Sequence, residues 1–404
     1  MDSDRIITPN ITSENGTLKT VITHFPGSEI EKMTPENAKN ALYSDLLNLH
    51  IASQEYALFR KALQYHAKVL EIKDLLAETL TNQEAKKFLI DSLKYTDGIS
   101  GETEKYLLNL NEEILAQTVI EGIEADNIKL NPAYNLFFTR DIAIVHNQTV
   151  LLPRMASQVR AKESAIAKTI FKFHPHFKIP PENIADAYLV QTDNLKFEGG
   201  DIHIISGNIT AIGMGLRTNL EGINFIISET SKHKQHTYII QELPTELDSY
   251  IHLDMLFSIL SSEACMVYRP VMESAQYKAT VLEAENGKIT ATREFHNLLE
   301  ALAYKGIYLK PIYCGNATPP YDAREQWHSG ANFFAVGNGK VIGYERNIHT
   351  LEALNKAGFE IIRAVDVDKY DLTSIDKYVI TFPGNELARG GGGARCMTMP
   401  VERL

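Results

Sequence analysis

The chain has 404 residues, of which 44% are hydrophobic and 23% are charged, as expected of a protein that buries a substantial core. This length allows one large domain with an inserted piece, or two domains. The formal net charge of -11 argues against a nucleic-acid partner or an anionic membrane surface, because both require a basic face.

The three cysteines, Cys265, Cys314 and Cys396, are far apart and include no close pair of the kind that zinc and redox sites use. We predict that Cys265 and Cys314 are small buried residues of the core. Residues Met1 to Asn10 lack the apolar core of a signal peptide. No apolar stretch approaches the ~20 residues that span a bilayer. The sequence therefore predicts a cytoplasmic protein with reduced thiols.

In chain order, the first predicted element is a strand at 16–24, which ends at the turn pair Pro26-Gly27. Thr34, with Pro35 at the first helical position, predicts the start of a helix within 34–68. A strand is expected at 66–72.

The stretch 73–125 is rich in Leu, Glu and Lys and has no strand-like alternation. It predicts an insertion of about three to five short helices, one of them starting at Ser100. This insertion could be a lid or a packing module without chemistry.

Beyond Pro132, short strands alternate with helices, which favours an α/β body over a sandwich or a helical bundle. No literal sequence repeat is visible. The predicted strands are 149–155, 225–229, 237–243, 340–345 and 377–382, and the predicted helices are 158–173 and 348–357.

Four polar clusters lie where strands should end: 135–141, 197–201, 251–254, and the glycine run 390–393 that precedes Cys396. In isolation, the Glu-Gly-Gly-Asp of the second cluster reads as a tight turn. The His-x-Asp of the third places two side chains on one face of a strand. The glycine run is harder to explain structurally, because each glycine costs an ordered structure roughly 0.5–1 kcal/mol relative to alanine. Backbone is therefore required close to the thiol.

Together these clusters supply a thiol, a histidine, one glutamate and three aspartates. Carboxylates hold a planar guanidinium through forked, charge-assisted hydrogen bonds. A guanidinium carbon resists attack by water, so a thiolate nucleophile lowers the barrier. The residues favour a guanidine-modifying hydrolase.

The same motifs resemble those of the arginine deiminase family along nearly the whole chain. The resemblance rests on six motifs in the family order: Ser13-Glu14-Asn15-Gly16 with His24 to Gly27, Asn135 to Asp141, Glu198 to Asp201, His252 to Asp254, Arg324-Glu325-Gln326-Trp327 with Gly330, Asn332 and Tyr344 to Asn347, and Arg395 to Pro400.

The resemblance implies an α/β fold, namely a five-bladed α/β propeller of ββαβ modules with an inserted helical bundle. Residues 1–72 and 126–404 would form the propeller, which is the catalytic domain, and residues 73–125 the insertion. We expect Trp327 to pack in the core and Arg324 and Glu325 to have structural roles.

The resemblance also implies the site. Cys396 would be the nucleophile, His252 the general acid/base, and Glu198 its assistant. The other expected residues are Asp141 and Asp254 for the guanidinium, Asn135, Arg160 and Arg217 for the amino-acid end of the substrate, and Asp201 as a site residue or a turn brace. Attack by Cys396 would release ammonia and leave an amidino-thiol intermediate, which water would convert to citrulline. No metal or organic cofactor is expected.

One departure from the family pattern bears on the substrate. Many members have an arginine that contacts the substrate carboxylate where this chain has Gly391. The glycine run is similar to that of agmatine deiminases, whose substrate has no carboxylate. Phe25 and His328-Ser329 are further departures without an assigned consequence.

The partner is expected to be a small guanidine, free L-arginine first, in a possible homo-oligomer and without nucleic acid or membrane. Agmatine, a modified arginine, amidino transfer to an amine, and a non-catalytic guanidine-binding protein remain alternatives.

Overall fold

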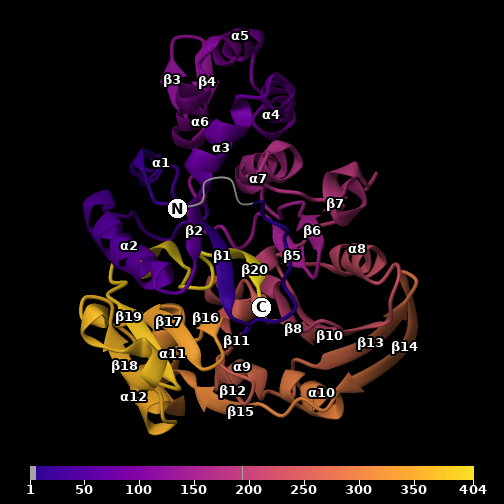
Figure 1. Ribbon diagram of the computed structural model, residues 1–404, viewed down its shortest axis with the longest axis vertical. Coiled ribbons are helices and arrows are strands. Elements are labelled where there is room, and N and C mark those ends of the chain that lie inside the picture. The colour runs from indigo at the N-terminus through magenta and orange to yellow at the C-terminus, as the bar shows by residue number, and fades with distance from the viewer. Residues whose placement is uncertain (1–5, 193) are drawn as a thin grey trace.

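The computed structural model describes residues 6–192 and 194–404. Within this part of the chain the strands form six sheets. Five of them make up the wide end of the molecule, and a group of helices projects from it (Figure 1). The result is a mixed α/β protein, as the alternation of strand and helix patterns predicted.

A repeated unit organises the five sheets: two antiparallel strands, a helix, and a third strand parallel to the second. In one copy, β5 (Ile144–His146) pairs with β6 (Thr149–Leu152), α7 (Ala161–Phe173) follows, and β7 (Ile184–Asp186) returns beside β6. This arrangement is the usual one for a crossover connection between parallel strands. The sequence showed no repeat at this level.

The next three sheets contain the same unit with additions. One comprises β8 (Ile202–Ser206), β9 (Ile209–Met214), α8 (Leu220–Thr230) and β10 (His236–Glu242), extended by β13 (Ala279–Glu285) and β14 (Lys288–Phe295). Another comprises β11 (Phe257–Ile259), β12 (Ala264–Val267), α9 (Arg269–Met272), α10 (Leu298–Tyr304) and β15 (Lys310–Tyr313). The third follows α11 (Tyr321–Trp327) and comprises β16 (Phe334–Gly337), β17 (Lys340–Tyr344), α12 (Ile348–Lys356), β18 (Glu360–Arg363) and β19 (Tyr378–Phe382).

The remaining unit joins the two ends of the described chain. β20 (Met399–Arg403) pairs antiparallel with β1 (Leu18–Thr23), and β2 (Lys68–Glu71) pairs parallel with β1 after α1 (Ser28–Glu31) and α2 (Leu49–Gln64). Figure 1 shows β1 and β20 side by side near the middle of the molecule. The strand that follows Cys396 is therefore held by the strand at the start of the chain.

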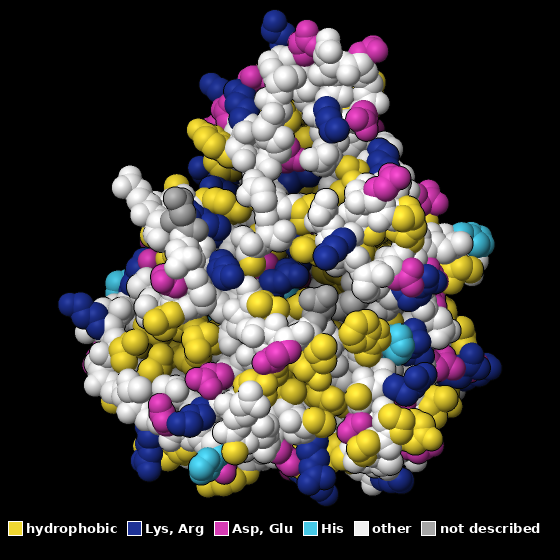
Figure 2. All heavy atoms as spheres, turned by 180° about the vertical axis from the view of Figure 1, so that it is seen from behind, with side chains coloured by type: hydrophobic (Ala, Val, Ile, Leu, Met, Phe, Trp, Pro, Cys, Tyr) yellow, Lys and Arg dark blue, Asp and Glu magenta, His cyan; other side chains and the backbone are white. Residues whose placement is uncertain are grey.

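The projecting part contains α3 (Ile72–Leu80), α4 (Gln83–Thr96), α5 (Gly101–Asn109) and α6 (Glu112–Glu121), followed by the hairpin β3 (Ile123–Ala125) and β4 (Ile128–Leu130). Four helices agree with the prediction for 73–125. Ser100 caps α5 as expected, its hydroxyl accepting a hydrogen bond from the Thr103 amide. The surface of this projection carries charged side chains of both signs (Figure 2).

Two of the predicted elements and one predicted core residue were wrong. Residues 35–42 form turns, and the helix begins only at Leu49, because the Asn48 side chain caps it by accepting from the Ile51 amide. The apolar run 225–229 lies within α8, whose cap is Asn219, and so forms no strand. A short apolar run has no period that distinguishes strand from helix. Trp327 is 48% exposed and does not pack in the core.

The other strand and helix predictions named above overlap observed elements, with boundaries shifted by a few residues. Cys265 and Cys314 are buried, as predicted. Among the described residues, no helix has the length and apolar character needed to cross a membrane.

Candidate active site

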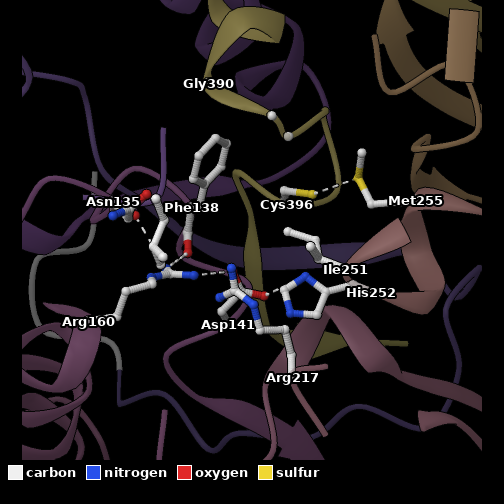
Figure 3. A pocket seen from close by; sticks show the side chains of 13 residues that line it. Asn135, Phe138, Asp141, Arg160, Arg217, Ile251, His252, Met255, Gly390 and Cys396 are labelled. Carbon is white, nitrogen blue, oxygen red and sulfur yellow. Dashed lines mark hydrogen bonds and ion pairs between the residues drawn. The ribbon is translucent and has the colours of Figure 1, made fainter. Parts of the chain in front are cut away.

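A pocket of about 390 Å³, counting the space at its open mouth, lies among the loops of the wide end (Figure 3). It brings together six of the nine residues predicted for the site. Its lining residues are Leu42, Asn135, Phe138, Asp141, Arg160, Arg217, Ile251, His252, Met255, Gly390, Gly391, Gly392 and Cys396.

The repeated unit explains why residues far apart in sequence meet in this pocket. Asp141 precedes β5, Glu198 precedes β8, His252 precedes β11 and Cys396 precedes β20. Each therefore lies just before the first strand of a unit. The predicted clusters fall at strand starts rather than at strand ends.

His252 is almost fully buried and lies between carboxylates. Its Nε2 is 2.9 Å from Oε2 of Glu198, and its Nδ1 is 3.7 Å from Oδ1 of Asp141. Burial alone would lower the pKa of His252, but Asp141 and Glu198 together raise it to about 9. The imidazole is therefore protonated at neutral pH and can supply a proton.

The prediction that His252 and Asp254 share one face of a strand was wrong. His252 is extended, and Leu253–Met255 form a 3-10 turn. Asp201 braces this turn: its Oδ1 accepts from the Leu253 amide at 2.9 Å, and its Oδ2 accepts from the Thr218 hydroxyl at 2.6 Å. Asp201 is buried, and burial raises its pKa to about 7. It lies behind the pocket and not in its lining.

Glu198 is fully buried behind His252. Its Oε2 is 3.2 Å from Nη1 of Arg217, and its Oε1 accepts from the Ala156 amide at 3.0 Å. Burial alone would raise the pKa of Glu198, but Arg217 and the hydrogen bond from His252 hold it well below its usual range. Glu198 is therefore a fixed negative charge that orients the imidazole.

Cys396 is 5% exposed, and acidic groups surround its thiol. Sγ lies 3.7 and 3.9 Å from the two carboxylate oxygens of Asp254. Burial, followed by Asp254 and Asp141, raises the pKa of Cys396 well above its usual value, although the Gly393 amide and Arg395 act in the opposite direction. These surroundings favour the thiol form of Cys396 over the thiolate.

Asp254 is also buried behind the pocket, where it forms an ion pair with Arg395. Nη1 of Arg395 is 3.0 Å from Oδ2 of Asp254, and the same guanidinium contacts both carboxylate oxygens of Glu14 at 3.0 and 3.1 Å. A residue near the start of the chain thus fixes the residue next to the nucleophile. The sequence reasoning quoted Glu14 and Arg395 within motifs but gave neither a role.

The two pocket arginines differ in how many N–H groups are already engaged. Arg160 donates from Nη1 to Asp141, from Nε to Glu163, and from Nη2 to the carbonyls of Asn135 and Phe138. Among the described residues, Arg217 donates hydrogen bonds only from Nη1, and only to the carboxylate of Glu198. Since a guanidinium has five N–H donors, Arg217 keeps more of them available. Figure 3 shows Asp141 between Arg160 and His252.

The glycine run brings backbone close to the pocket, as the sequence suggested. A Cβ on Gly392 would lie 2.4 Å from the Phe138 ring, and one on Gly393 would lie 2.7 Å from Oδ1 of Asn332. Gly391 has φ +85° and open space around its Cβ position. A side chain at residue 392 or 393 would therefore collide with a neighbouring side chain. At residue 391 there is room for a side chain, but the positive φ favours glycine.

Two groups of side chains among the described residues have atoms close enough together for a metal ion: Asp141, Glu198 and His252, and, far from the pocket, Glu78, His174 and His176. In the first group, Arg160 pairs with Asp141 and Arg217 with Glu198. Both carboxylates already have guanidinium partners, so this group fits the acid/base role better than a cation site.

No role was predicted for Asn332, which belongs to one of the sequence motifs, or for Met255. The side-chain amide of Asn332 donates to Sγ of Cys396 at 3.1 Å, and the sulfur of Met255 is 4.0 Å from Sγ. Asn332 precedes β16, the first strand of its unit. Like the other site residues, it lies just before the first strand of a unit, and this position is the signal that could have identified it.

A buried thiol, an imidazole and paired carboxylates meet at one pocket of this mixed α/β fold, which is the kind of site an enzyme uses for nucleophilic and acid/base chemistry. The sequence model of the arginine deiminase family matches residues 107–403, and the chain therefore belongs to the arginine deiminase family.

Curated relatives agree with this assignment, and a solved structure has a similar fold. The chain is 29% identical to the arginine deiminase of Borrelia recurrentis (strain A1), and 30% identical to that of Listeria welshimeri serovar 6b, with 98% of each chain covered in both comparisons. The product-bound N-terminal domain of ArgZ, an arginine dihydrolase from cyanobacteria, has a similar fold, with a TM-score of 0.55, 15% identity, and 95% of this chain and 97% of that chain covered.

Proposed function

We propose that this protein hydrolyses the guanidinium group of free L-arginine to citrulline and ammonia through a covalent intermediate on Cys396. The observation that carries the proposal is the presence of Cys396, protonated His252 and Asp141 in one pocket. Membership of the arginine deiminase family and the names of its relatives support arginine as the substrate.

Binding of a guanidinium beside Asp141 activates the thiol. Burial and, after it, the negative charges of Asp254 and Asp141 raise the pKa of Cys396. A cation placed among them offsets these charges, so the pKa of the thiol falls when substrate binds. The thiol then loses its proton to the solvent, where it is later taken up by the released ammonia, and the thiolate forms a bond to the guanidinium carbon.

His252 completes both halves of the reaction. It gives its proton to the departing nitrogen, the C–N bond breaks, and ammonia leaves an amidino group on Sγ. A water molecule then gives a proton to the neutral imidazole and attacks the same carbon. The C–S bond breaks, which releases citrulline and returns the thiol. Glu198 keeps the imidazole in position throughout.

The amino-acid end of the substrate is assigned to Arg217, Arg160 and Asn135. Arg217 has the most unengaged N–H groups and is the main candidate for the carboxylate. Nδ2 of Asn135 donates to the Ala41 carbonyl, which leaves its side-chain oxygen available for an ammonium group.

Acid-quench mass spectrometry tests the proposal. The purified protein is mixed with arginine and quenched in acid within seconds, and the peptide that contains Cys396 is weighed. An amidino adduct on this peptide together with free citrulline is expected. Citrulline without an adduct in a rapid-quench series would overturn covalent catalysis, and the absence of both would overturn arginine as the substrate.

Agmatine is a second candidate substrate, because Gly391 provides no third guanidinium for a carboxylate and leaves open space at its position. A substrate panel of arginine, agmatine and Nω-methylated arginine separates the candidates. We expect arginine to have the highest kcat/KM; a higher value for agmatine would reverse the assignment.

We also propose that the five sheets are the blades of a propeller around the pocket, since their shared strand order supports such an arrangement. Residues 73–125 would then be an insertion between the first and second blades. A cytoplasmic location suits the three free cysteines.

A further inference from the structure

Asn332 is buried directly behind the nucleophile, on the side away from the pocket. It is 2% exposed and is absent from the pocket lining, which includes Cys396. Its Nδ2 lies 3.1 Å from Sγ of Cys396 and 3.0 Å from the carbonyl oxygen of Asp254. A substrate in the pocket would therefore leave this contact with the sulfur in place.

The hydrogen bonds on its other side fix which end of the amide faces the sulfur. Oδ1 accepts from the backbone amides of Arg395 at 2.8 Å and Cys396 at 3.3 Å. Only an oxygen can accept two N–H groups, and only the –NH₂ end can donate to the Asp254 carbonyl. The group that faces Sγ is thus an N–H donor.

This donor opposes the effect of the other side chains near the sulfur. The Asp254 carboxylate disfavours a thiolate, and the Met255 thioether offers no donor. The Gly393 amide is a second donor that lowers the pKa of Cys396. A Cβ on Gly393 would lie 2.7 Å from Oδ1 of Asn332, so a glycine at this position permits the close approach of the asparagine.

We infer that Asn332 stabilises the thiolate of Cys396, both when it attacks and when it leaves the carbon again. This role rests on Cys396 being the proposed nucleophile. A hydrogen bond to a charged acceptor contributes about 1.5–3 kcal/mol, which corresponds to roughly 10- to 100-fold in thiolate population. Asn332 lies shortly before β16, as Cys396 lies shortly before β20.

The titration of Cys396 in the substrate-free protein distinguishes this role from a structural one. The rate of alkylation by iodoacetamide is measured against pH, and the modified peptide is identified by mass. In Asn332→Ala we expect the midpoint to rise, with the rate at a fixed lower pH falling roughly 10-fold or more. If Asn332 only held the loop around Cys396 in place, its removal should lower the midpoint instead. A loosened loop would let water reach the thiol, and hydration lowers the pKa of a buried thiol. An unchanged or lowered midpoint would overturn the inference.

Tyr344→Phe is the matched control. The Tyr344 hydroxyl donates to the Gly392 carbonyl at 2.8 Å and so anchors the same loop without donating to Sγ. Its removal is expected to leave the midpoint unchanged or lower it.

If Asn332→Ala does not fold, wild-type protein labelled with ¹⁵N-asparagine provides the test. One side-chain amide signal should shift with the Cys396 titration and should stop shifting in Cys396→Ala. The absence of any such signal would overturn the inference. Neither experiment requires turnover. A failure of the proposed activity can therefore be distinguished from a failure of Asn332 to stabilise the thiolate.

Discussion

The α-carbon of Gly200 faces the imidazole of His252 so closely that a Cβ on residue 200 would lie 2.5 Å from Nδ1. The same Cβ would lie 3.0 Å from Oδ1 of Asp141. The Glu-Gly-Gly-Asp motif thus provides a carboxylate and also the space in which the general acid/base sits against Asp141.

Gly200→Ala is therefore expected to reduce kcat strongly, by ~100-fold or more, because a displaced imidazole misaligns proton transfer. Circular dichroism should show an intact fold. Gly207→Ala is the matched control, since its Cβ would have no neighbour closer than 3.6 Å. Equal activity in both variants would contradict this explanation of the glycine.

Cys396→Ser should abolish turnover, with a loss of ~1,000-fold or more, while the protein still folds and binds arginine. A hydroxyl has a far higher pKa than a thiol and is a poor nucleophile toward a guanidinium carbon. Citrulline formation and isothermal titration with arginine measure the two properties. Appreciable residual turnover would show that another group attacks the substrate.

Arg160→Ala and Arg217→Ala should separate stability from recognition. Arg160 is buried and pairs with Asp141 and Glu163, so its removal strands two buried carboxylates and should cost about 3–5 kcal/mol of unfolding free energy. The side chain of Arg217 is 14% exposed and, within the described part of the chain, forms an ion pair with Glu198 alone. Its removal should raise KM for arginine more than it lowers stability. Chemical denaturation measures the unfolding free energy, and steady-state kinetics measures KM. Equal losses of stability in the two variants would contradict the different roles assigned to Arg160 and Arg217.

The raised pKa of His252 has a consequence for stability at alkaline pH. The folded protein holds this proton up to about 9, against an ordinary value of 6.5. The stability that protonated His252 contributes is fully present below pH 6.5. It declines above this pH and is lost as the pH rises through about 9. Denaturation midpoints of wild type and His252→Asn should therefore converge across this interval. In Glu198→Gln the imidazole pKa, followed by NMR, should fall; a rise would contradict the role of Glu198.

Removal of Met397 to Leu404 should inactivate the protein and destabilise it. The truncation deletes β20 and its pairing with β1. It also removes the Arg403 guanidinium, which donates to the Ala335 and Gly16 carbonyls at 2.7 Å. Activity and thermal unfolding of the truncated protein check this expectation. Full activity would show that β20 does not hold Cys396 in place.

Much of the candidate site could be predicted from sequence because its residues occur in compact motifs. Six of the predicted residues line one pocket, with Glu198, Asp201 and Asp254 just behind them. The role of Asp201 as a brace for the His252 turn depends on contacts between residues 52 positions apart, which no local pattern encodes. For the same reason the buried pair of Glu14 and Arg395 could be seen only in the structure.

The fold was partly predictable for a related reason. Long helices such as α2 and α7 have clear periodicity, but their starting points depend on which polar residue caps them. Thr34 was a plausible cap, yet the helix is capped by Asn48. The repeat of two strands, a helix and a strand is defined by pairing between distant segments, and the divergent sequences of its five copies leave no visible trace.

The pairing of β1 with β20 also bears on the order in which the chain is synthesised. β1 leaves the ribosome early, at residues Leu18–Thr23, whereas its antiparallel neighbour is formed by Met399–Arg403. Throughout most of translation the early strand therefore has one edge without its partner, and the thiol has no site in which to react. The sheet that holds the strand after Cys396 can therefore form only once Met399–Arg403 has been made, although its other strands, β1 and β2, come from the first part of the chain.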